Sequence, residues 1–546
     1  MHARKTRTAS VLTGGLLGVT LLATSSGAAG SILDLTDVPN ANPKTAGSTS
    51  PNVLSPELAE IEAARGSMPL ENGTSLISHY GYNGDGPMLP APGDVQAVGH
   101  NVEASKTEPD KNVYLVLEGQ RGADPLYDYG THFLFQGHEG GAQGYVTRIN
   151  LDADVAHRVT LIATGDDAGS LPTFDGITYD PFRQKLLLTA EHGNSPRGGV
   201  WSLDPALPES GLGRAHNIPA LGYGGFEGIQ NDDQGNVFLV EDTGGVTVPT
   251  KAKQPNSFVY KFVPAAPGDL ASGAMYALQV KSARTGQPIT FHAADPAGDA
   301  LSPDVADLHK LGVSFATDWV KVHDTATDGQ SSYDVNTAAK AAGGTPFKRP
   351  ENGVFRPGTR FREFFFTETG DTNATSSAND GFGGYGGVFR LTLGDKRSSA
   401  GSLELFASGD KAHTGFDNIA FVSKNGLAVV EDAGDSLHTQ RKALDSGYLY
   451  DVSHDYSDGA APLRFLAQGR DPSATVDSGL SGLPGFQNDG DNEITGIHFS
   501  DGDAGVGGLL GAKIPKPFRD DWRAFYTAQH GDNITWELVR RGLRDE

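Results

Sequence analysis

The sequence predicts an all-β protein, a six-bladed β-propeller with one segment inserted between blades. The 72 glycines among 546 residues separate short clusters of aromatic and β-branched residues, which is typical of many short strands joined by turns. One acidic motif recurs along the chain, and a further β-rich run follows each copy. Repeated small antiparallel meanders of this kind build a propeller.

The recurring motif is an acid after an aromatic residue or proline, followed by a small residue, an apolar residue, a polar turn and a β-rich run that ends in an acid. Clear copies begin at Phe174, Phe226, Pro350 and Phe416, a looser copy begins at Glu493, and a weak one falls near residues 93–118. Six third strands are expected at 145–151, 199–203, 257–263, 387–393, 448–452 and 534–539. A β-sandwich is the alternative, but it does not predict the same acid in every unit.

The chain divides into three parts. Residues 1–29 are predicted to be a secretory signal, because three cations precede a short apolar run that ends in small residues. Residues 30–70 are rich in Ala, Pro, Ser and Asn and are predicted to be a flexible linker, with one short helix over 56–65. Residues 71–546 then form a single propeller domain, with an insertion at about 265–345.

Charge and cysteine content limit the partners. The net charge of −24 repels phosphate backbones and anionic lipid, so nucleic acid and membrane surfaces are not expected partners. No segment after the leader is apolar enough to span a membrane. With no cysteine, an exported chain depends on a large core or on bound metal. We therefore expect a secreted protein, extracellular or periplasmic, that is a monomer and acts on a small molecule.

Four pairs of acids are predicted to face one another at the same end of their hairpins. The midpoint between Glu227 and Glu241 falls at Gln234, inside a polar turn, and residues equidistant from a hairpin turn are opposite each other. The same spacing relates Asp175 to Glu191, Glu351 to Glu368, and Asp417 to Glu431. If these hairpins surround the channel, their carboxylates meet at one mouth.

Carboxylates gathered in this way need cations to stay ionised in a partly dry site. Oxygen-rich clusters suit Ca²⁺, Mg²⁺ or Mn²⁺, and carboxylates combined with imidazole also suit iron. His192 and His530 stand beside strand ends and are the candidate imidazoles. The alternative is that these acids cap turns. The sequence contains no Gly-x-Ser-x-Gly, His-Glu-x-x-His or P-loop motif, so it does not indicate a serine hydrolase.

Four segments, taken together and in order, resemble the PhoX-type family of secreted alkaline phosphatases, over most of the chain after about Leu76. They are Gln136-Gly137-His138-Glu139, Phe226-Glu227, the segment ending Arg349-Pro350-Glu351, and Glu493-Ile494-Thr495-Gly496 with the later Gln529-His530. The resemblance implies a six-bladed propeller that carries iron and calcium in its channel and hydrolyses phosphate monoesters, phytate-like esters included.

The resemblance also implies roles for residues. Glu227 and Glu351 would be iron or bridging ligands, and calcium or shared ligands would be Glu191, Glu241, Asp417, Glu431 and Glu493. Bound metals would neutralise phosphate oxygens and hold an activated water. Arg349 and Arg197 are expected to steady the phosphate charge, with His530 as a third candidate catalytic residue.

The sequence departs from the family pattern at one position. Where the family carries an iron-binding cysteine, this chain has Ala190, within Thr189-Ala190-Glu191-His192. Without that thiolate two other functions stay open. One is a non-catalytic, calcium-stabilised propeller that binds a ligand or a cell-wall component, and the other is a metal-dependent lactonase or esterase.

Overall fold

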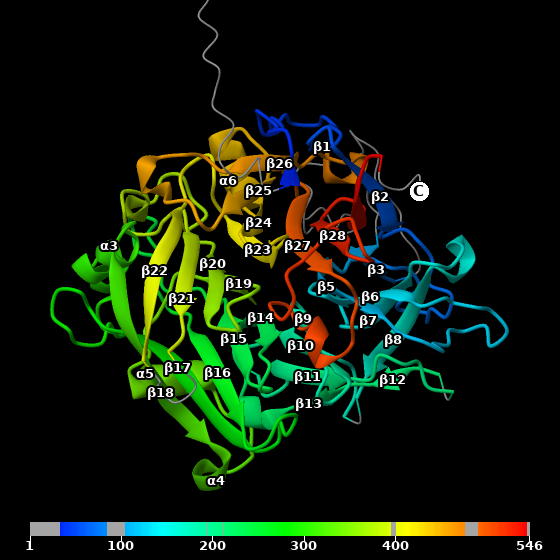
Figure 1. Cartoon of the computed structure of the whole chain (residues 1–546), viewed down its shortest axis with the longest axis horizontal. Helices are drawn as coiled ribbons and strands as arrows, with labels where there is room; N and C mark the ends of the chain where they lie inside the picture. The colour runs from blue at the N-terminus through cyan, green and yellow to red at the C-terminus, as the bar shows by residue number, and fades with distance from the viewer. Residues whose placement is uncertain are drawn as a thin grey trace, which may run out of the picture.

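The computed structural model describes residues 33–84, 104–166, 168–193, 195–209, 211–394, 400–475 and 490–542. The predicted signal lies outside these ranges. The described chain is mostly β, with its sheets in a propeller-like arrangement around a centre (Figure 1). Four sheets have four or five strands and one has nine, so the hydrogen-bonded sheets do not divide into the six separate blades that the sequence predicts. Within the described ranges no helix is long and apolar enough to cross a membrane.

Most strands follow one another as antiparallel meanders that run from the centre outwards; β12 is an exception, because it pairs in parallel with β8 at the edge of the first sheet. In chain order they are β5 (Pro109–Val116), β6 (His132–His138), β7 (Val146–Asn150), β8 (Val159–Gly165); β9 (Ile177–Asp180), β10 (Lys185–Ala190), β11 (Gly199–Leu203), β12 (Gly213–Arg214), β13 (His216–Asn217); β14 (Phe226–Asn231), β15 (Val237–Glu241), β16 (Val259–Pro264), β17 (Gly273–Val280), β18 (Ser314–Asp324); β19 (Pro350–Phe355), β20 (Glu363–Glu368), β21 (Gly387–Thr392), β22 (Gly401–Ser408); β23 (Phe416–Phe421), β24 (Gly426–Glu431), β25 (Ser446–Asp451), β26 (Leu463–Ala467); β27 (Glu493–Ser500), β28 (Arg523–Gln529) and β29 (Ile534–Arg540). The six predicted third strands correspond to β7, β11, β16, β21, β25 and β29.

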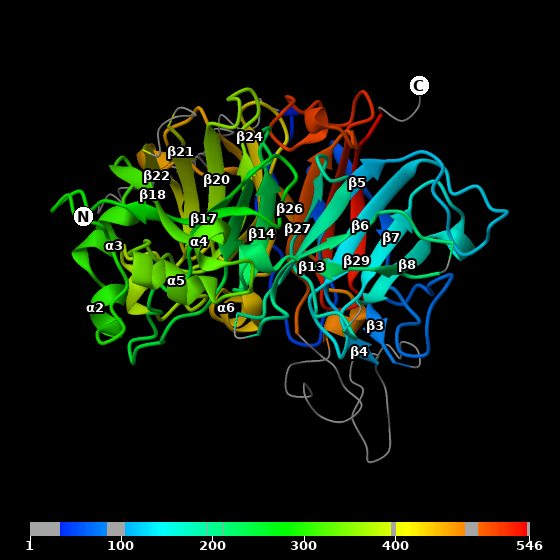
Figure 2. The same ribbon diagram turned by 90° about the horizontal axis from the view of Figure 1, so that it is seen from below.

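Six strands line the centre. β5 contacts β9, and contacts continue in order through β14, β19, β23 and β27 back to β5, which closes a ring. Figure 2 shows this ring from the side: helix α6 (Gly434–Arg441) lies at one face, and the loop that follows β27 lies at the opposite face. Every side chain at the start of these six strands therefore lies near the same mouth of the ring.

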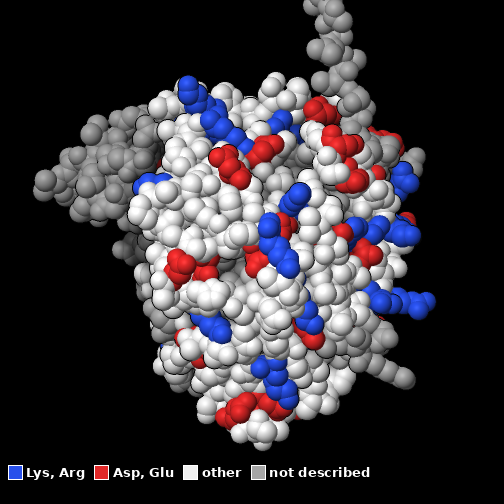
Figure 3. Space-filling model, turned by 90° about the vertical axis from the view of Figure 1, so that its left-hand side faces the viewer, with Lys and Arg blue, Asp and Glu red and all other residues white. Residues whose placement is uncertain are grey.

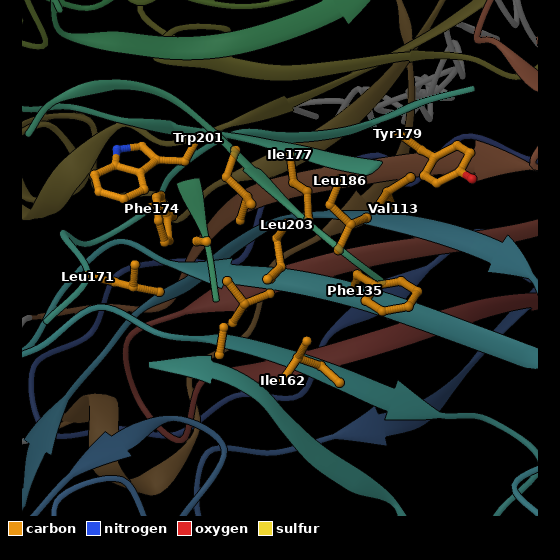
Figure 4. Packing of buried hydrophobic residues seen from close by; sticks show 14 of the residues in the cluster. Val113, Phe135, Ile162, Leu171, Phe174, Ile177, Tyr179, Leu186, Trp201 and Leu203 are labelled. Carbon is orange, nitrogen blue, oxygen red and sulfur yellow. The ribbon is translucent and has the colours of Figure 1, made fainter. Parts of the chain in front are cut away.

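Apolar side chains between neighbouring sheets hold the ring together. In one cluster Phe135, Phe174, Leu186, Leu188 and Trp201 are almost fully buried between the first two meanders (Figure 4). Along β10, Leu186 and Leu188 of this cluster alternate with Leu187, which packs in the next cluster, as a two-sided strand requires. Burial of each large apolar side chain contributes about 1.5–3 kcal/mol, which lets a cysteine-free chain of this length keep its fold.

The segment predicted to be a linker belongs to the sheets. β1 (Val53–Leu54) pairs with β26, and β2 (Leu58–Ala64) pairs with β29, so each is the outermost strand of its sheet. The predicted helix over 56–65 is therefore wrong. An isolated ten-residue helix is marginal in water, whereas the open edge of β29 offers unpaired backbone groups to an extended segment.

The predicted insertion at about 265–345 is also part of the β architecture. β17 continues the meander that begins at β14, and β18 pairs with both β17 and β22, which joins two meanders into the nine-stranded sheet. The helices α2 (Pro296–Ala300), α3 (Pro303–Leu308), α4 (Thr325–Asp328) and α5 (Val335–Ala342) lie between and after these strands. On the face of the molecule at this side, acidic and basic side chains are dispersed in small groups (Figure 3).

Candidate metal centre

A β-bulge turns one acid of each motif towards the channel. In β14, Phe226 pairs with Glu241 and Ile229 pairs with Leu239, so two residues of β14 stand opposite one of β15. The first of the two is Glu227. The same bulge occurs in β5, β19 and β23, where its first residue is Asp110, Glu351 and Asp417. A bulge re-aims side chains at one point of a strand, and here it aims four carboxylates.

The motif that begins at Phe174 has a similar geometry, although its acid, Asp175, lies just before the strand β9. The backbone N–H of Asp175 donates to the carbonyl of Thr189, and the Thr189 N–H donates to the carbonyl of Gly176. A Cβ at Gly176 would lie 2.0 Å from the carbonyl oxygen of Glu227. Glycine at this position therefore allows the Asp175 segment to approach the next inner strand closely.

A second set of channel residues comes directly after the second strand of each meander. Glu139 follows β6, Glu191 follows β10, Asp242 follows β15 and Asp432 follows β24, and all four line one cavity. Thr369, after β20, lines it as well. Because side chains alternate along a strand, the preceding residue faces away from the channel.

The cavity at this mouth has a volume of about 280 Å³. Nine carboxylates line it, and Asp175 joins them as a neighbour of Asp110, Glu139, Glu191 and Glu227. Four groups of three carboxylates each offer oxygens that lie within 4.8 Å of one another: Asp110, Asp175 and Glu227; Glu139, Asp175 and Glu191; Glu191, Glu227 and Asp242; and Glu227, Glu351 and Asp417. Glu227 belongs to three of these groups and is the acid that links them.

Burial and mutual repulsion raise the pKa of these acids. Burial is the larger cause for Asp175, and the charges of Asp110 and Glu139 add to it, so the pKa of the Asp175 carboxyl lies well above its ordinary value. The pKa of Glu227 is raised in the same way, by burial and then by Asp175 and Glu351. Burial and the charge of Asp242 raise the pKa of Glu351 to about 7. At neutral pH these groups keep full charge only if cations join them.

The buried oxygens fit metal ligands. Both carboxylate oxygens of Asp175 and one of Asp110 are buried, and they accept no hydrogen bond from any residue that the structure describes. Buried carboxylate oxygens without donors are costly, and coordination of a cation is the usual way in which proteins satisfy them. Oxygen-only sets of this kind suit hard cations.

Arg349 lines this cavity, and Lys111 acts electrostatically on its acids from an adjoining, smaller cavity. At the rim, the Arg349 guanidinium donates from Nε and Nη2 to the Asp242 carboxylate at 2.9 and 2.6 Å, and its Nη2 lies 3.5 Å from Glu351 Oε1. Within the channel, the Lys111 ammonium donates to Asn352 Oδ1 at 2.9 Å. These two cations do not balance ten carboxylates.

The structure brings together six of the ten predicted metal ligands: Asp175, Glu191, Glu227, Glu351, Asp417 and Glu493. His530, one of the three candidate catalytic residues, lies at the edge of this group. Its Nδ1 is 2.9 Å from the Asp491 carbonyl oxygen and 3.4 Å from Glu493 Oε2, and its Nε2 is 3.5 Å from Glu108 Oε1.

Three predicted ligands, Glu241, Glu368 and Glu431, point away from the cavity. Glu241 accepts hydrogen bonds from the Tyr260 hydroxyl and the Asn336 amide at 2.8 and 3.0 Å. Glu368 Oε2 lies 2.6 Å from His309 Nε2, and Glu431 Oε2 accepts from the Ser446 N–H at 3.0 Å. The positions of these three acids therefore give their predicted ligand role no support: each carboxylate has hydrogen-bond partners within its own sheet or on the elements packed against it, and the bulge shifts the register by one residue.

Two further predicted residues lie outside the lining of the cavity. Arg197 pairs with Asp166 at 3.2 Å and stacks over the Trp201 ring at 5.2 Å, so it holds the loop after β10 to the first sheet. His192 Nε2 lies 3.3 Å from the Thr173 hydroxyl, and burial lowers the pKa of its imidazole. Neither the catalytic role of Arg197 nor the ligand role of His192 receives support from these positions.

Four cavity carboxylates were not among the predicted ligands: Asp110, Glu139, Asp242 and Asp432. Asp110 follows Pro109, so it matches the acid-after-proline motif in the copy that is hardest to recognise. Asp242 and Asp432 stand directly after the predicted Glu241 and Glu431. For Asp110, Asp242 and Asp432 the sequence therefore contained a signal, although it did not give the exact position of the acid in the strand.

Ala190, which the resemblance aligns with an iron-binding cysteine, packs in the apolar cluster with Phe174 and Trp201. Its neighbour Glu191 lines the cavity. The replaced position therefore lies among apolar side chains, and the carboxylate set stands without a contribution from it.

The fold and the site together define a propeller-like protein with a carboxylate-lined cavity suited to cations. The profile of the alkaline phosphatase PhoX family matches residues 197–505, and this chain belongs to that family. It is a phosphatase-type protein. A comparison with curated protein sequences gives no match.

Among solved structures, the chain is similar to Pseudomonas fluorescens PhoX in complex with vanadate, a transition-state analogue. The identity is 13%, the TM-score is 0.54, and the match covers 93% of this chain and 98% of that one. A gluconolactonase from Xanthomonas campestris matches at 11% identity with a TM-score of 0.37, over 92% of this chain and 99% of the other. The WD40 domain of Toxoplasma gondii coronin matches at 12% identity with a TM-score of 0.33, over 80% and 88%. At these identities the likeness to PhoX concerns the fold.

Proposed function

We propose that this protein is an exported, metal-dependent phosphatase that hydrolyses phosphate monoesters in the carboxylate cavity. The observation that carries the proposal is the convergence of ten carboxylates, three of whose buried oxygens have no donor among the described residues, at one mouth of the ring. Membership of the PhoX family supports the reaction class. We further propose that the nine-stranded sheet represents two blades joined at their outer edges, which gives six blades around the ring.

Bound metal ions would supply positive charge to the phosphate oxygens and an activated oxygen nucleophile. We assign the ligands to the four carboxylate groups around Glu227, namely Asp110, Glu139, Asp175, Glu191, Glu227, Asp242, Glu351 and Asp417. Calcium suits such all-oxygen sets, and a smaller trivalent ion such as Fe³⁺ suits the places where three carboxylates converge. Asp432 and Glu493 extend the same wall.

Arg349 is placed to hold the substrate. Asp242 fixes its Nε and Nη2, which leaves Nη1 to donate towards a phosphate oxygen at the rim. A planar guanidinium fixed in this way makes short, charge-assisted hydrogen bonds to a phosphoryl group. Because the cavity is small and lined with charge, it suits the phosphoryl end of an ester and leaves the leaving group outside.

The test is an assay of purified protein with p-nitrophenyl phosphate after chelation, and after addition of Ca²⁺, Fe³⁺ or both. We expect activity to disappear on chelation and to return with metal. Glu227→Gln should lower kcat by about a hundredfold or more, since it removes a shared ligand. Glu241→Gln is the matched control, because Glu241 is a buried acid whose carboxylate accepts hydrogen bonds from Tyr260 and Asn336 and does not line the cavity, so this variant should keep most of the activity.

Turnover that is absent in every metal state, with intact fold and bound calcium, would overturn the phosphatase proposal in favour of a calcium-stabilised binding propeller. Equal activity of Glu227→Gln and Glu241→Gln would remove the cavity from the reaction. Either result leaves the family membership unaffected.

A further inference from the structure

Lys111 occupies an unusual place in the ring. It is the second residue of the β5 bulge and is 2% exposed. Its ammonium donates to Asn352 Oδ1, on β19, at 2.9 Å. In the order of the ring, β5 and β19 are three strands apart in either direction, so the lysine side chain crosses the channel from one wall to the opposite wall.

The partner of Lys111 is held in position. The Asn352 N–H donates to the Thr367 hydroxyl at 3.1 Å, and the Asn352 amide nitrogen lies 3.5 Å from Asp417 Oδ1. With that amide nitrogen towards Asp417, the amide oxygen is left to face the ammonium. The contact is therefore built by side chains on four strands, β5, β19, β20 and β23, and is not an incidental approach of a long side chain.

The corresponding positions in other bulges carry no charge. They are Gly228, Asn352 and Asn418, and the equivalent residue in the second motif is Gly176. A Cβ at Gly228 would lie 2.9 Å from the Glu351 carbonyl oxygen, and Asn418 donates to the Thr495 carbonyl at 2.6 Å. These residues serve the contact with the next strand. Among these equivalent positions, only Lys111 carries a charged side chain, and that side chain extends across the channel.

The surroundings of the ammonium are acidic on one side and closed on the other. Asp110, Asp175, Glu227 and Asp417 act on it electrostatically, and all four belong to the candidate ligand groups. Farther along the inner strands the space shrinks to a cavity of about 30 Å³, lined mainly by apolar residues with Lys111 and the buried His498. A space of that size holds about one water molecule.

We propose that Lys111 is a resident cation that forms the floor of the metal cavity and takes the place of one metal ion among the carboxylates. This inference rests on the proposed metal cavity. The ammonium neutralises part of the carboxylate charge in every state of metal loading, and it closes the channel, so ions and substrate enter only from the mouth that carries the acids.

The experiment measures bound metal and thermal stability, not activity. Lys111→Ala removes the cation and opens its space, whereas Lys111→Met removes the charge and keeps most of the volume. After saturation with Ca²⁺ and dialysis, elemental analysis should find one more calcium per chain in Lys111→Ala than in the wild type, and no additional ion in Lys111→Met. In both variants the metal-free protein should melt lower, and added Ca²⁺ should raise Tm by more than it does in the wild type.

Lys261→Met is the matched control, because Lys261 is a half-buried lysine on β16 whose amine lies over the Trp319 ring at 4.6 Å and does not line the carboxylate cavity. Its loss should lower Tm equally with and without Ca²⁺. Equal calcium content of Lys111→Ala and wild type, together with an unchanged Ca²⁺-induced rise in Tm, would overturn the inference while leaving the metal cavity in place. A wild-type protein that binds no metal would overturn the proposed function, and the inference with it.

Discussion

Neutralising one cavity acid should have opposite effects on the metal-free and metal-loaded protein. The informative change is Asp175→Asn, because Asp175 is 1% exposed, belongs to two ligand groups, and has two oxygens without a donor among the described residues. At 4.8 Å, two unit charges repel by about 3.5 kcal/mol at an effective dielectric constant of 20. The total free-energy cost of burying the charged Asp175 among other acids cannot exceed the cost of protonating it. For an ordinary pKa of 3.8, protonation at pH 7 costs about 4 kcal/mol.

The asparagine variant avoids part of that cost but is still a buried polar group. We therefore expect a net gain of about 1–3 kcal/mol for the metal-free protein, which corresponds to a rise in Tm of about 1–3 °C for a chain of this length. With Ca²⁺ the sign reverses, because a ligand has been removed and the Ca²⁺-induced rise in Tm shrinks. Differential scanning fluorimetry of chelated and Ca²⁺-saturated samples measures both quantities.

Glu241→Gln is the control. Glu241 is equally buried but accepts hydrogen bonds from Tyr260, Asn336 and the Phe258 N–H, so its replacement should lower Tm with and without metal. If Asp175→Asn lowers Tm in the metal-free state as Glu241→Gln does, and its response to Ca²⁺ equals that of the wild type, then Asp175 is an ordinary structural acid and our account of the cavity is refuted.

Three further changes test other parts of the structure. The metal-free protein should melt higher at pH 5.5 than at pH 8. An acid whose pKa is raised in the folded state, such as Glu351 from 4.5 to about 7, stabilises the fold at low pH and loses that contribution as the pH rises through 7. A Tm that does not depend on pH after chelation would contradict this. Arg349→Lys should lower kcat/KM for a phosphate monoester by about tenfold to a hundredfold, because a lysine cannot keep both contacts with Asp242 and still donate to the substrate; unchanged kinetics would exclude Arg349 from the site. Deletion of residues 33–64 removes the outer strands β1 and β2, so Tm should fall and light scattering should show aggregation through the exposed edges of β26 and β29. An unchanged Tm would instead support the prediction that this segment is a linker.

Much of the fold was predictable because each copy of the repeated motif marks where a hairpin begins and therefore where its strands lie. The motif at Phe174, Phe226, Pro350 and Phe416 marks the start of each hairpin, and the third strands follow where alternation of aromatic and apolar residues places them. The N-terminal strands were not predictable. Leu58–Ala64 reads as Leu-Ala-Glu-Ile-Glu-Ala-Ala, a composition that suits a helix, and it becomes a strand only because β29, nearly 500 residues later, presents an open edge.

For two of the predicted pairs, Glu227 with Glu241 and Asp417 with Glu431, the prediction missed the second cavity acid by one residue, and this error has a single physical cause. Counting from a turn assumes that each residue of one strand faces one of the other, which pairs Glu227 with Glu241. The bulge inserts an extra residue, so Phe226 pairs with Glu241, and Glu227 turns towards the channel together with Asp242. The same displacement exchanges Glu431 for Asp432.

That displacement also separates two kinds of buried acid that look alike in the sequence. Glu241 and Glu431 each have backbone and side-chain donors, which makes them cost little without metal. Asp175, buried with unsatisfied oxygens beside other carboxylates, has no such compensation. Buried channel acids whose oxygens have no hydrogen-bond donor, such as Asp175, are therefore the ones to assign to cations. The acids at the end of the second strand, one residue before the channel acids Asp242 and Asp432, are the ones to assign to the fold.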